Sequence, residues 1–142
     1  NMQTSARNQF SGTVTRVNAG VVTDEIQIKT DSGAELVATI THGSAQQLGL
    51  AQGSSVIALI KAPSVIVVTD AQGMRFSARN QLAGTVAKVH TGSVNTEVQI
   101  DAQGLKVVAI VTNESASTLG LMEGKAATAL FKASQVVLAV PA

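Results

Sequence analysis

The polar residues of this chain that could do chemistry occur twice. Ser5-Ala6-Arg7-Asn8-Gln9 is followed by Gly12-Thr13-Val14, and the same residues return 72 positions later as Ser77-Ala78-Arg79-Asn80-Gln81 and Gly84-Thr85-Val86. A strand needs only alternating apolar residues. Folding therefore does not explain why a hydroxyl, a guanidinium and an amide recur together. This excess over what a strand requires predicts a site, present in two copies.

Two further polar groups repeat, a Thr-x-x-Ser pair and a Lys-Ala pair. They are Thr41 with Ser44 and Lys61 with Ala62 in the first copy, and Thr112 with Ser115 and Lys132 with Ala133 in the second. Together with the Ser-x-Arg pair they form a set of hydrogen-bond donors. Hydroxyls, a guanidinium, an ammonium and the free N–H groups of a first helical turn are the chemistry of an anion site.

No Asp or Glu belongs to this repeated set, and that bears on which anion it would take. Phosphate near neutral pH carries a proton and favours a site with an acceptor, whereas a fully ionised tetrahedral oxyanion only accepts hydrogen bonds. A donor-only cluster therefore favours sulfate, molybdate or tungstate.

Each polar group also has a structural interpretation. The arginines could pair with a nearby carboxylate, the lysines could protect strand ends, and the threonines could be helix caps. Asn8 and Asn80 are typical turn residues. Glu25 and Glu97 repeat only as isolated carboxylates, and the two histidines are unmatched, so neither catalysis nor a protein-ligated metal cation is predicted.

The elements that must position these residues read mostly as short strands. Repetition extends over the whole chain, which predicts one domain at residues 1–70 and a second at 71–142. Each copy shows five apolar or alternating runs and one short helix, at about 43–48 and 113–119. Thr41 and Thr112 would cap these helices, with Gly49 and Gly120 at their ends. The expected fold is all-β, with two tandem OB-like small barrels.

Composition narrows the function classes. The chain has 142 residues, 45% hydrophobic but only 2% aromatic, with 13% charged residues and a net charge of +1. Repeats of this size are marginal alone, and so few charges suggest surface buried in an oligomer. Single-strand nucleic-acid binders use aromatic platforms and a basic groove, so this chain alone is not expected to bind nucleic acid. No run is long enough to span a membrane as a helix.

The combined motif resembles a known family. Ser-Ala-Arg-Asn-x-x-x-Gly-x-Val, then Thr-x-x-Ser-Ala-x-x-Leu-Gly-Leu, then Lys-Ala-x-x-Val is similar to the Mop domain of the molybdenum-pterin-binding proteins, or molbindins. The resemblance covers nearly the whole chain, twice, as in the di-Mop molbindins. It implies small OB-like barrels, trimers of two-domain subunits, and oxyanions bound at subunit interfaces without an organic cofactor.

Carried over by motif, the resemblance implies two equivalent kinds of oxyanion site whose ligands can come from different subunits. The first comprises Ser5, Arg7, Thr41, Ser44, Lys61 and Ala62, and the second Ser77, Arg79, Thr112, Ser115, Lys132 and Ala133. Both alanines would act through their backbone N–H groups. A further site on a threefold axis is implied at Val94, Asn95 and Glu97. The first copy has Thr23 where the second has Asn95.

The implied function is molybdate binding, with tungstate as a second ligand, by a cytoplasmic homotrimeric storage protein that is not an enzyme. The alternative is the sensing half of a molybdate-responsive transcription regulator, cut from a longer protein. Two intact Ser-Ala-Arg-Asn copies, and Met2 just ahead of the first, favour the stand-alone protein.

Overall fold

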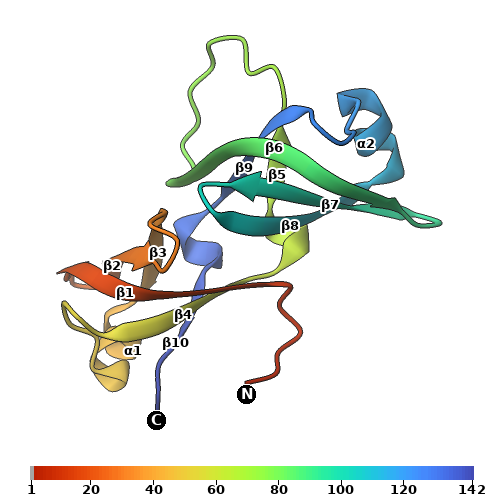
Figure 1. Ribbon diagram of the computed structural model, residues 1–142. Helices are drawn as coiled ribbons and strands as arrows, with labels where there is room; N and C mark the ends of the chain where they lie inside the picture. The colour runs from red at the N-terminus through yellow and green to blue at the C-terminus, as the bar shows by residue number, and fades with distance from the viewer. Residues whose placement is uncertain (1) are drawn as a thin grey trace.

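The computed structural model describes residues 2–142 and consists of two lobes, each built on a curled five-stranded antiparallel sheet (Figure 1). This confirms the expected all-β architecture of two OB-like units with one short helix each. The first repeat forms β1 Asn8–Asn18, β2 Thr23–Thr30, β3 Glu35–Thr41, α1 His42–Leu48, β4 Ser55–Ile60, the 3-10 turn η1 Ala62–Ser64, and β5 Ile66–Val68. The second forms β6 Asn80–Thr91, β7 Asn95–Ala102, β8 Leu105–Thr112, α2 Asn113–Leu119, β9 Ala126–Phe131, η2 Ala133–Gln135, and β10 Val137–Ala139.

Period-two patterning places the apolar side chains on the inner face of each sheet. Along β2, Ile26 and Ile28 are fully buried while their neighbours are only partly covered or exposed. Their counterparts Val98 and Ile100 on β7 are buried in the same way. The largest buried side chains are Val, Ile and Leu with Phe131, as the near absence of aromatic residues requires.

The last strand of each repeat belongs to the sheet of the other repeat. The first sheet has the order β10-β4-β1-β2-β3, and the second the order β5-β9-β6-β7-β8. Val137 of β10 lies opposite Leu59 of β4, and Ile66 of β5 lies opposite Leu130 of β9. The two sheets are therefore joined by a reciprocal exchange of strands. The division into domains at residues 1–70 and 71–142 stays a prediction. Neither repeat supplies all five strands of a sheet by itself.

The chain crosses between the lobes at the two 3-10 turns. Lys61 precedes η1 and Lys132 precedes η2, both in extended conformation. The following alanines, Ala62 and Ala133, are buried at the crossings. The repeated Lys-Ala pair thus marks the point where each chain segment leaves one sheet for the other.

Both helices are capped as the sequence predicts. The Thr41 side chain accepts a hydrogen bond from the Ser44 N–H, and Thr112 does the same for Ser115. Gly49 has the left-handed conformation that ends α1, at φ 64°. The threonine hydroxyl of each Thr-x-x-Ser pair is therefore used in helix capping, and it also donates to the serine hydroxyl.

Candidate functional site

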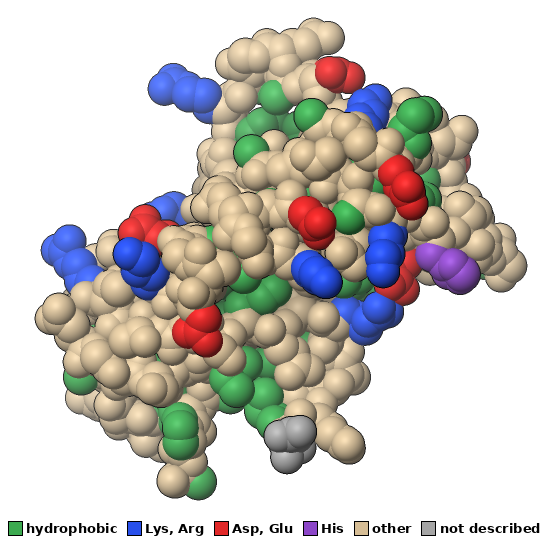
Figure 2. Space-filling model, in the orientation of Figure 1, with side chains coloured by type: hydrophobic (Ala, Val, Ile, Leu, Met, Phe, Trp, Pro, Cys, Tyr) green, Lys and Arg blue, Asp and Glu red, His purple; other side chains and the backbone are tan. Residues whose placement is uncertain are grey.

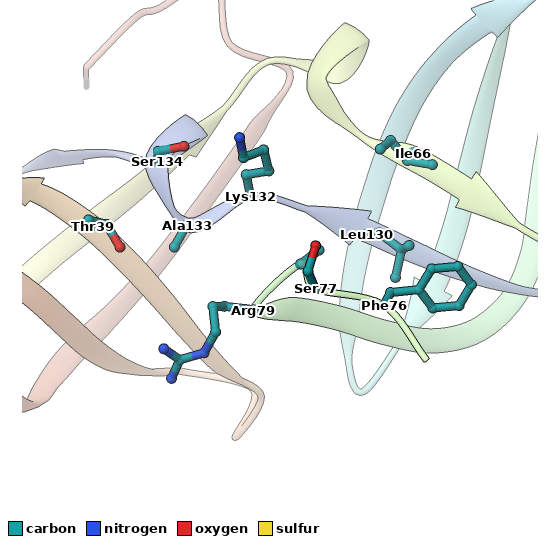
Figure 3. A pocket seen from close by; sticks show the side chains of 10 residues that line it. Thr39, Ile66, Phe76, Ser77, Arg79, Leu130, Lys132, Ala133 and Ser134 are labelled. Carbon is teal, nitrogen blue, oxygen red and sulfur yellow. The ribbon is translucent and has the colours of Figure 1, made fainter. Parts of the chain in front are cut away.

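A pocket of about 470 Å³ lies at the junction of the two lobes and gathers four of the predicted residues of the second site (Figure 3). Ser77 and Arg79 come from the segment that enters β6, and Lys132 and Ala133 come from the crossing between β9 and η2. The rest of the lining is formed by Thr39, Ile66, Phe76, Ala78, Leu130 and Ser134. Two repeated groups far apart in sequence, Ser-x-Arg and Lys-Ala, thus meet in space.

The equivalent pocket of the first repeat is smaller and brings together fewer of the predicted residues. It has a volume of about 330 Å³, and its lining includes Ser5, Lys61, Ser64, Ser134 and Val137. Arg7 and Ala62 are not part of its lining. The two pockets therefore differ in shape and in the position of their arginine.

The helix-start hydroxyls lie elsewhere within this one chain. Thr112 and Ser115 line a separate pocket of about 450 Å³ with Glu114, Thr118 and Leu119. The Thr112 and Ser115 hydroxyls are 2.9 Å apart, and those of Thr41 and Ser44 are 2.7 Å apart. The structure of the single chain does not bring these pairs to the Ser-Arg-Lys pockets.

Neither pocket lining includes Asp or Glu, but each arginine of the predicted set pairs with a carboxylate of the other lobe. Arg7 donates from Nη1 and Nη2 to Glu97 over 2.9 and 2.6 Å, and Arg79 donates to Glu25 over 2.6 and 3.2 Å. Hydrogen bonds from these guanidinium groups, together with their charge, lower the pKa of both carboxyls. The structural interpretation of the arginines as ion-pair partners therefore holds in this structure.

Each ion pair bridges the two lobes. Arg7 enters β1 of the first sheet, whereas Glu97 lies on β7 of the second, and Arg79 and Glu25 reverse that relationship. The side chains remain between about a quarter and a half exposed, with Arg7 at 50% and Glu25 at 28%. Figure 2 shows positive and negative side chains interspersed over one face of the molecule rather than gathered by sign.

Asn8 and Asn80 were expected to form turns, and the structure places them instead in the contact between the lobes. The buried Asn8 amide donates to the Val108 carbonyl over 2.8 Å and accepts from the Val108 N–H over 2.7 Å. Asn80 makes the same pair of bonds with Val37. Each amide copies the hydrogen bonding of a strand neighbour at a sheet edge. Docking of the lobes therefore explains why Asn recurs beside Arg.

Sequence reasoning missed a second pair of residues that are matched in position but not in type. Asp24 is buried and accepts hydrogen bonds from the Gly20 N–H and from His42, each at 2.9 Å. In the second repeat Thr96 donates to Asn113, which in turn donates to the Gly92 carbonyl. Both sets tie the loop after the first long strand to the start of the helix. An alignment of the two copies would reveal these positions only if it compared hydrogen-bonding capacity rather than residue identity.

The residues of the predicted threefold site lie at the start of β7. Val94 is 70% exposed and Asn95 is exposed at the first position of the strand. The Glu97 side chain is directed to Arg7 rather than to open solvent. Within residues 2–142 no group of three or more His, Cys, Asp or Glu side chains is arranged to hold a metal ion, and no helix there is long and apolar enough to cross a membrane.

Comparison with known proteins agrees with these observations. The TOBE domain model matches residues 4–67 and again residues 77–138. Two curated relatives are the molybdenum-pterin-binding protein MopA of Rhodobacter capsulatus, 47% identical over 99% of this chain, and the molybdenum transport protein ModE of Azotobacter vinelandii, 46% identical over 98%. The chain spans about half the length of these relatives, 53% and 52% respectively.

A solved structure shares both the fold and the extent of the chain. It is that of the cytoplasmic molybdate-binding protein ModG with molybdate bound, at 46% identity and a TM-score of 0.95. The match covers 99% of this chain and 100% of that one. The two repeats, their strand exchange and these matches together show that the chain belongs to the TOBE-domain family, as a tandem pair of such domains.

Proposed function

We propose that this protein binds molybdate, without chemical conversion, as a cytoplasmic store or buffer. The observation that carries the proposal is the pocket at the lobe junction, whose lining brings Ser77 and Arg79 together with Lys132 and the buried Ala133 from a distant part of the sequence. Guanidinium, ammonium and hydroxyl donors offset the cost of stripping water from a dianion. The likeness to ModG, which covers the full length of that chain, supports molybdate as the ligand and the cytoplasm as the location.

Completion of the site by other subunits is part of the proposal. The helix-start hydroxyls at Thr41, Ser44, Thr112 and Ser115 lie outside the Ser-Arg-Lys pockets of their own chain. A homotrimer would let the helix start of one subunit face the pocket of the next. Exposed Val21, Val22 and Val94 provide apolar surface for such an assembly. The threefold-axis site at Val94, Asn95 and Glu97 and the binding of tungstate belong to the same proposal.

The second candidate is the sensing half of a transcription regulator. It is favoured by the match to ModE proteins, of which this chain spans about half. The full-length match to ModG favours the store.

Thermal unfolding with added anions tests the proposed function. Millimolar molybdate or tungstate should raise the unfolding midpoint, because a ligand that binds only the native state stabilises it. Sulfate and phosphate should raise it less. Absence of a shift with every anion would refute the proposal.

The Arg79→Ala variant tests the assignment of the pocket. We expect the fold to remain intact, because an exposed ion pair contributes only about 0–1 kcal/mol, while the molar ratio of bound molybdate falls in isothermal titration. Arg16→Ala, which removes an exposed arginine of β1 outside the pocket, is the control. An unchanged ratio for Arg79→Ala would rule this residue out as a ligand.

A further inference from the structure

The guanidinium of Arg79 is turned away from the pocket whose lining includes this residue. Figure 3 shows this side chain extending away from Lys132 and Ser77. Its two terminal nitrogens are held by Glu25 on β2, at 2.6 and 3.2 Å. In the first repeat Arg7 is held by Glu97 in the same way and does not line its pocket at all. The two guanidinium groups, which should bind an anion most strongly, are therefore paired with carboxylates outside the pockets.

The bound carboxylate resembles the proposed ligand in the way it meets arginine. A guanidinium presents parallel N–H groups that match two oxygen atoms of a carboxylate or of a tetrahedral oxyanion. Glu97 fills that fork with both Oε atoms. A carboxylate and an oxyanion cannot occupy the same pair of terminal N–H groups at once. Binding of the oxyanion through these groups thus requires the carboxylate to leave.

We propose that Glu25 and Glu97 are internal competitors for the oxyanion sites, each holding the site arginine until an anion displaces it. This inference rests on the proposed function and adds to it two carboxylates that weaken binding. The ion pairs are well suited to displacement because they are partly exposed, and such pairs hold together only weakly. Recurrence of Glu at the same place in both repeats, with the same reciprocal partner, agrees with a shared role.

The competitor also links the ligand to the contact between the lobes. Each Arg–Glu pair joins one lobe to the other, so an anion that takes the arginine removes one of these bridges. The buried Asn8 and Asn80 contacts remain to keep the lobes docked. Release of the carboxylate can therefore occur without separation of the sheets.

The test compares the wild-type protein with Glu25→Gln and Glu97→Gln, each titrated with the dianion molybdate and with perchlorate, a tetrahedral monoanion. Glutamine keeps the size of the side chain but cannot form the ion pair. Glu123→Gln, which removes the same charge from an exposed loop outside every pocket described above, is the matched control. Dissociation constants come from isothermal titration, or from the shift in unfolding midpoint where binding is weak.

Removal of a competitor raises the affinity of the site for every anion by the same factor. We expect both anions to bind roughly fivefold more tightly to the Glu25 and Glu97 variants, a factor that matches the upper range for an exposed ion pair, and the control to be unchanged. A gain much larger for molybdate than for perchlorate would show a general field effect of the lost charge, and would overturn the proposal. Weaker binding would also overturn it, by showing that the carboxylate orients the arginine. If the wild-type protein binds neither anion, the proposed function fails together with the competitor role. If it binds them and the glutamate variants bind no more tightly, only the competitor role fails.

Discussion

At the scale of single residues, the repeated motif serves two purposes that its sequence does not separate. Within Ser-Ala-Arg-Asn, the Asn8 amide joins the two lobes, and the Arg7 guanidinium is paired with Glu97, the carboxylate that we propose the ligand displaces. The Asn side chain substitutes for a strand at a sheet edge, where unpaired N–H and C=O groups would otherwise remain. One short motif therefore contributes to the docking of the lobes and, under the proposed function, to binding of the anion.

Loss of the Asn8 amide should be costly. Asn8→Ala leaves both the N–H and the carbonyl of the buried Val108 without a partner. We expect the free energy of unfolding to fall by about 2–6 kcal/mol, because each of the two unsatisfied buried groups costs about 1–3 kcal/mol. Urea unfolding measures the change. The neighbouring exposed Gln9→Ala should stay within about 0.5 kcal/mol, and equal effects of the two variants would contradict the role given to Asn8.

The Asp24 contacts predict a dependence of stability on pH. The Gly20 N–H hydrogen bond, assisted by His42, lowers the pKa of Asp24 below its ordinary value of 3.8. A carboxyl whose pKa is lower in the folded state stabilises the fold above the ordinary value, and that contribution is lost as the pH falls through the folded value. The unfolding midpoint of the wild-type protein should therefore decline steeply in acid.

The second repeat supplies the control for this effect. Asp24→Thr with His42→Asn copies the uncharged Thr96 and Asn113 arrangement. Below about pH 4 the unfolding midpoint of the double variant should fall less than that of the wild type, because the double variant lacks the Asp24 carboxyl. Glu25 and Glu97 titrate in both proteins, so they do not account for the difference. Midpoint curves that run parallel down to about pH 3 would show that Asp24 does not contribute.

At the scale of elements, the long first strand of each repeat has a bulge, and a glycine just before the bulge lies in close contact with the neighbouring strand. β1 carries a bulge between Val14 and Arg16, and β6 carries the same irregularity between Val86 and Lys88. Gly84 lies just before it, where a Cβ atom would sit 2.0 Å from the Asp101 carbonyl oxygen. Glycine is required there by space rather than by an unusual φ angle.

Two glycine substitutions should therefore have opposite effects. Gly84→Ala forces β6 away from β7 and should lower the free energy of unfolding by about 1–3 kcal/mol. Gly43→Ala in α1 meets no atom within 4 Å and should raise it by about 0.5–1 kcal/mol. Thermal unfolding of both variants provides the measurement, and a loss of stability in Gly43→Ala would contradict the helix assignment.

Local pattern was enough to predict the strands, the helix caps and the fold class, because alternation and capping depend on residues within a few positions of each other. It predicted the meeting of Ser77 with Lys132 only through resemblance to a family. The partners of the arginines and the contacts of the asparagines were missed because they join residues 43 to 100 positions apart. The exchange of β5 and β10 leaves no local signal either, since an exchanged strand has the same pattern as one that stays in its own repeat.

At the scale of the whole molecule, the exchanged strands hold the two repeats together, so the covalent connection between β5 and β6 is not needed for assembly. β5 and β6 lie in the same sheet, and the chain between them, residues 69–79, forms a protruding loop (Figure 1). Its Asp70 and Gln72 have φ angles of 52°, and Met74 is 69% exposed. The lobes are held instead by η1, η2 and the two exchanged strands.

A cut in this loop should therefore leave the molecule assembled. A recognition sequence for a site-specific protease, inserted between Gln72 and Gly73, would allow complete cleavage. We expect the two halves to elute together in size-exclusion chromatography and to separate only in denaturant, because each half supplies a strand to the sheet of the other. An insertion of equal length without the recognition sequence is the control. Separation of the halves in native buffer would contradict the exchange.

The position of β10 has a consequence for the order in which the protein is made. β4 is complete by residue 60, but its neighbour β10 begins only at residue 137. During synthesis the first sheet keeps the β4 edge open until β10 has emerged from the ribosome. A chain that stops before β10 therefore lacks a strand of the sheet whose other four strands were synthesised first.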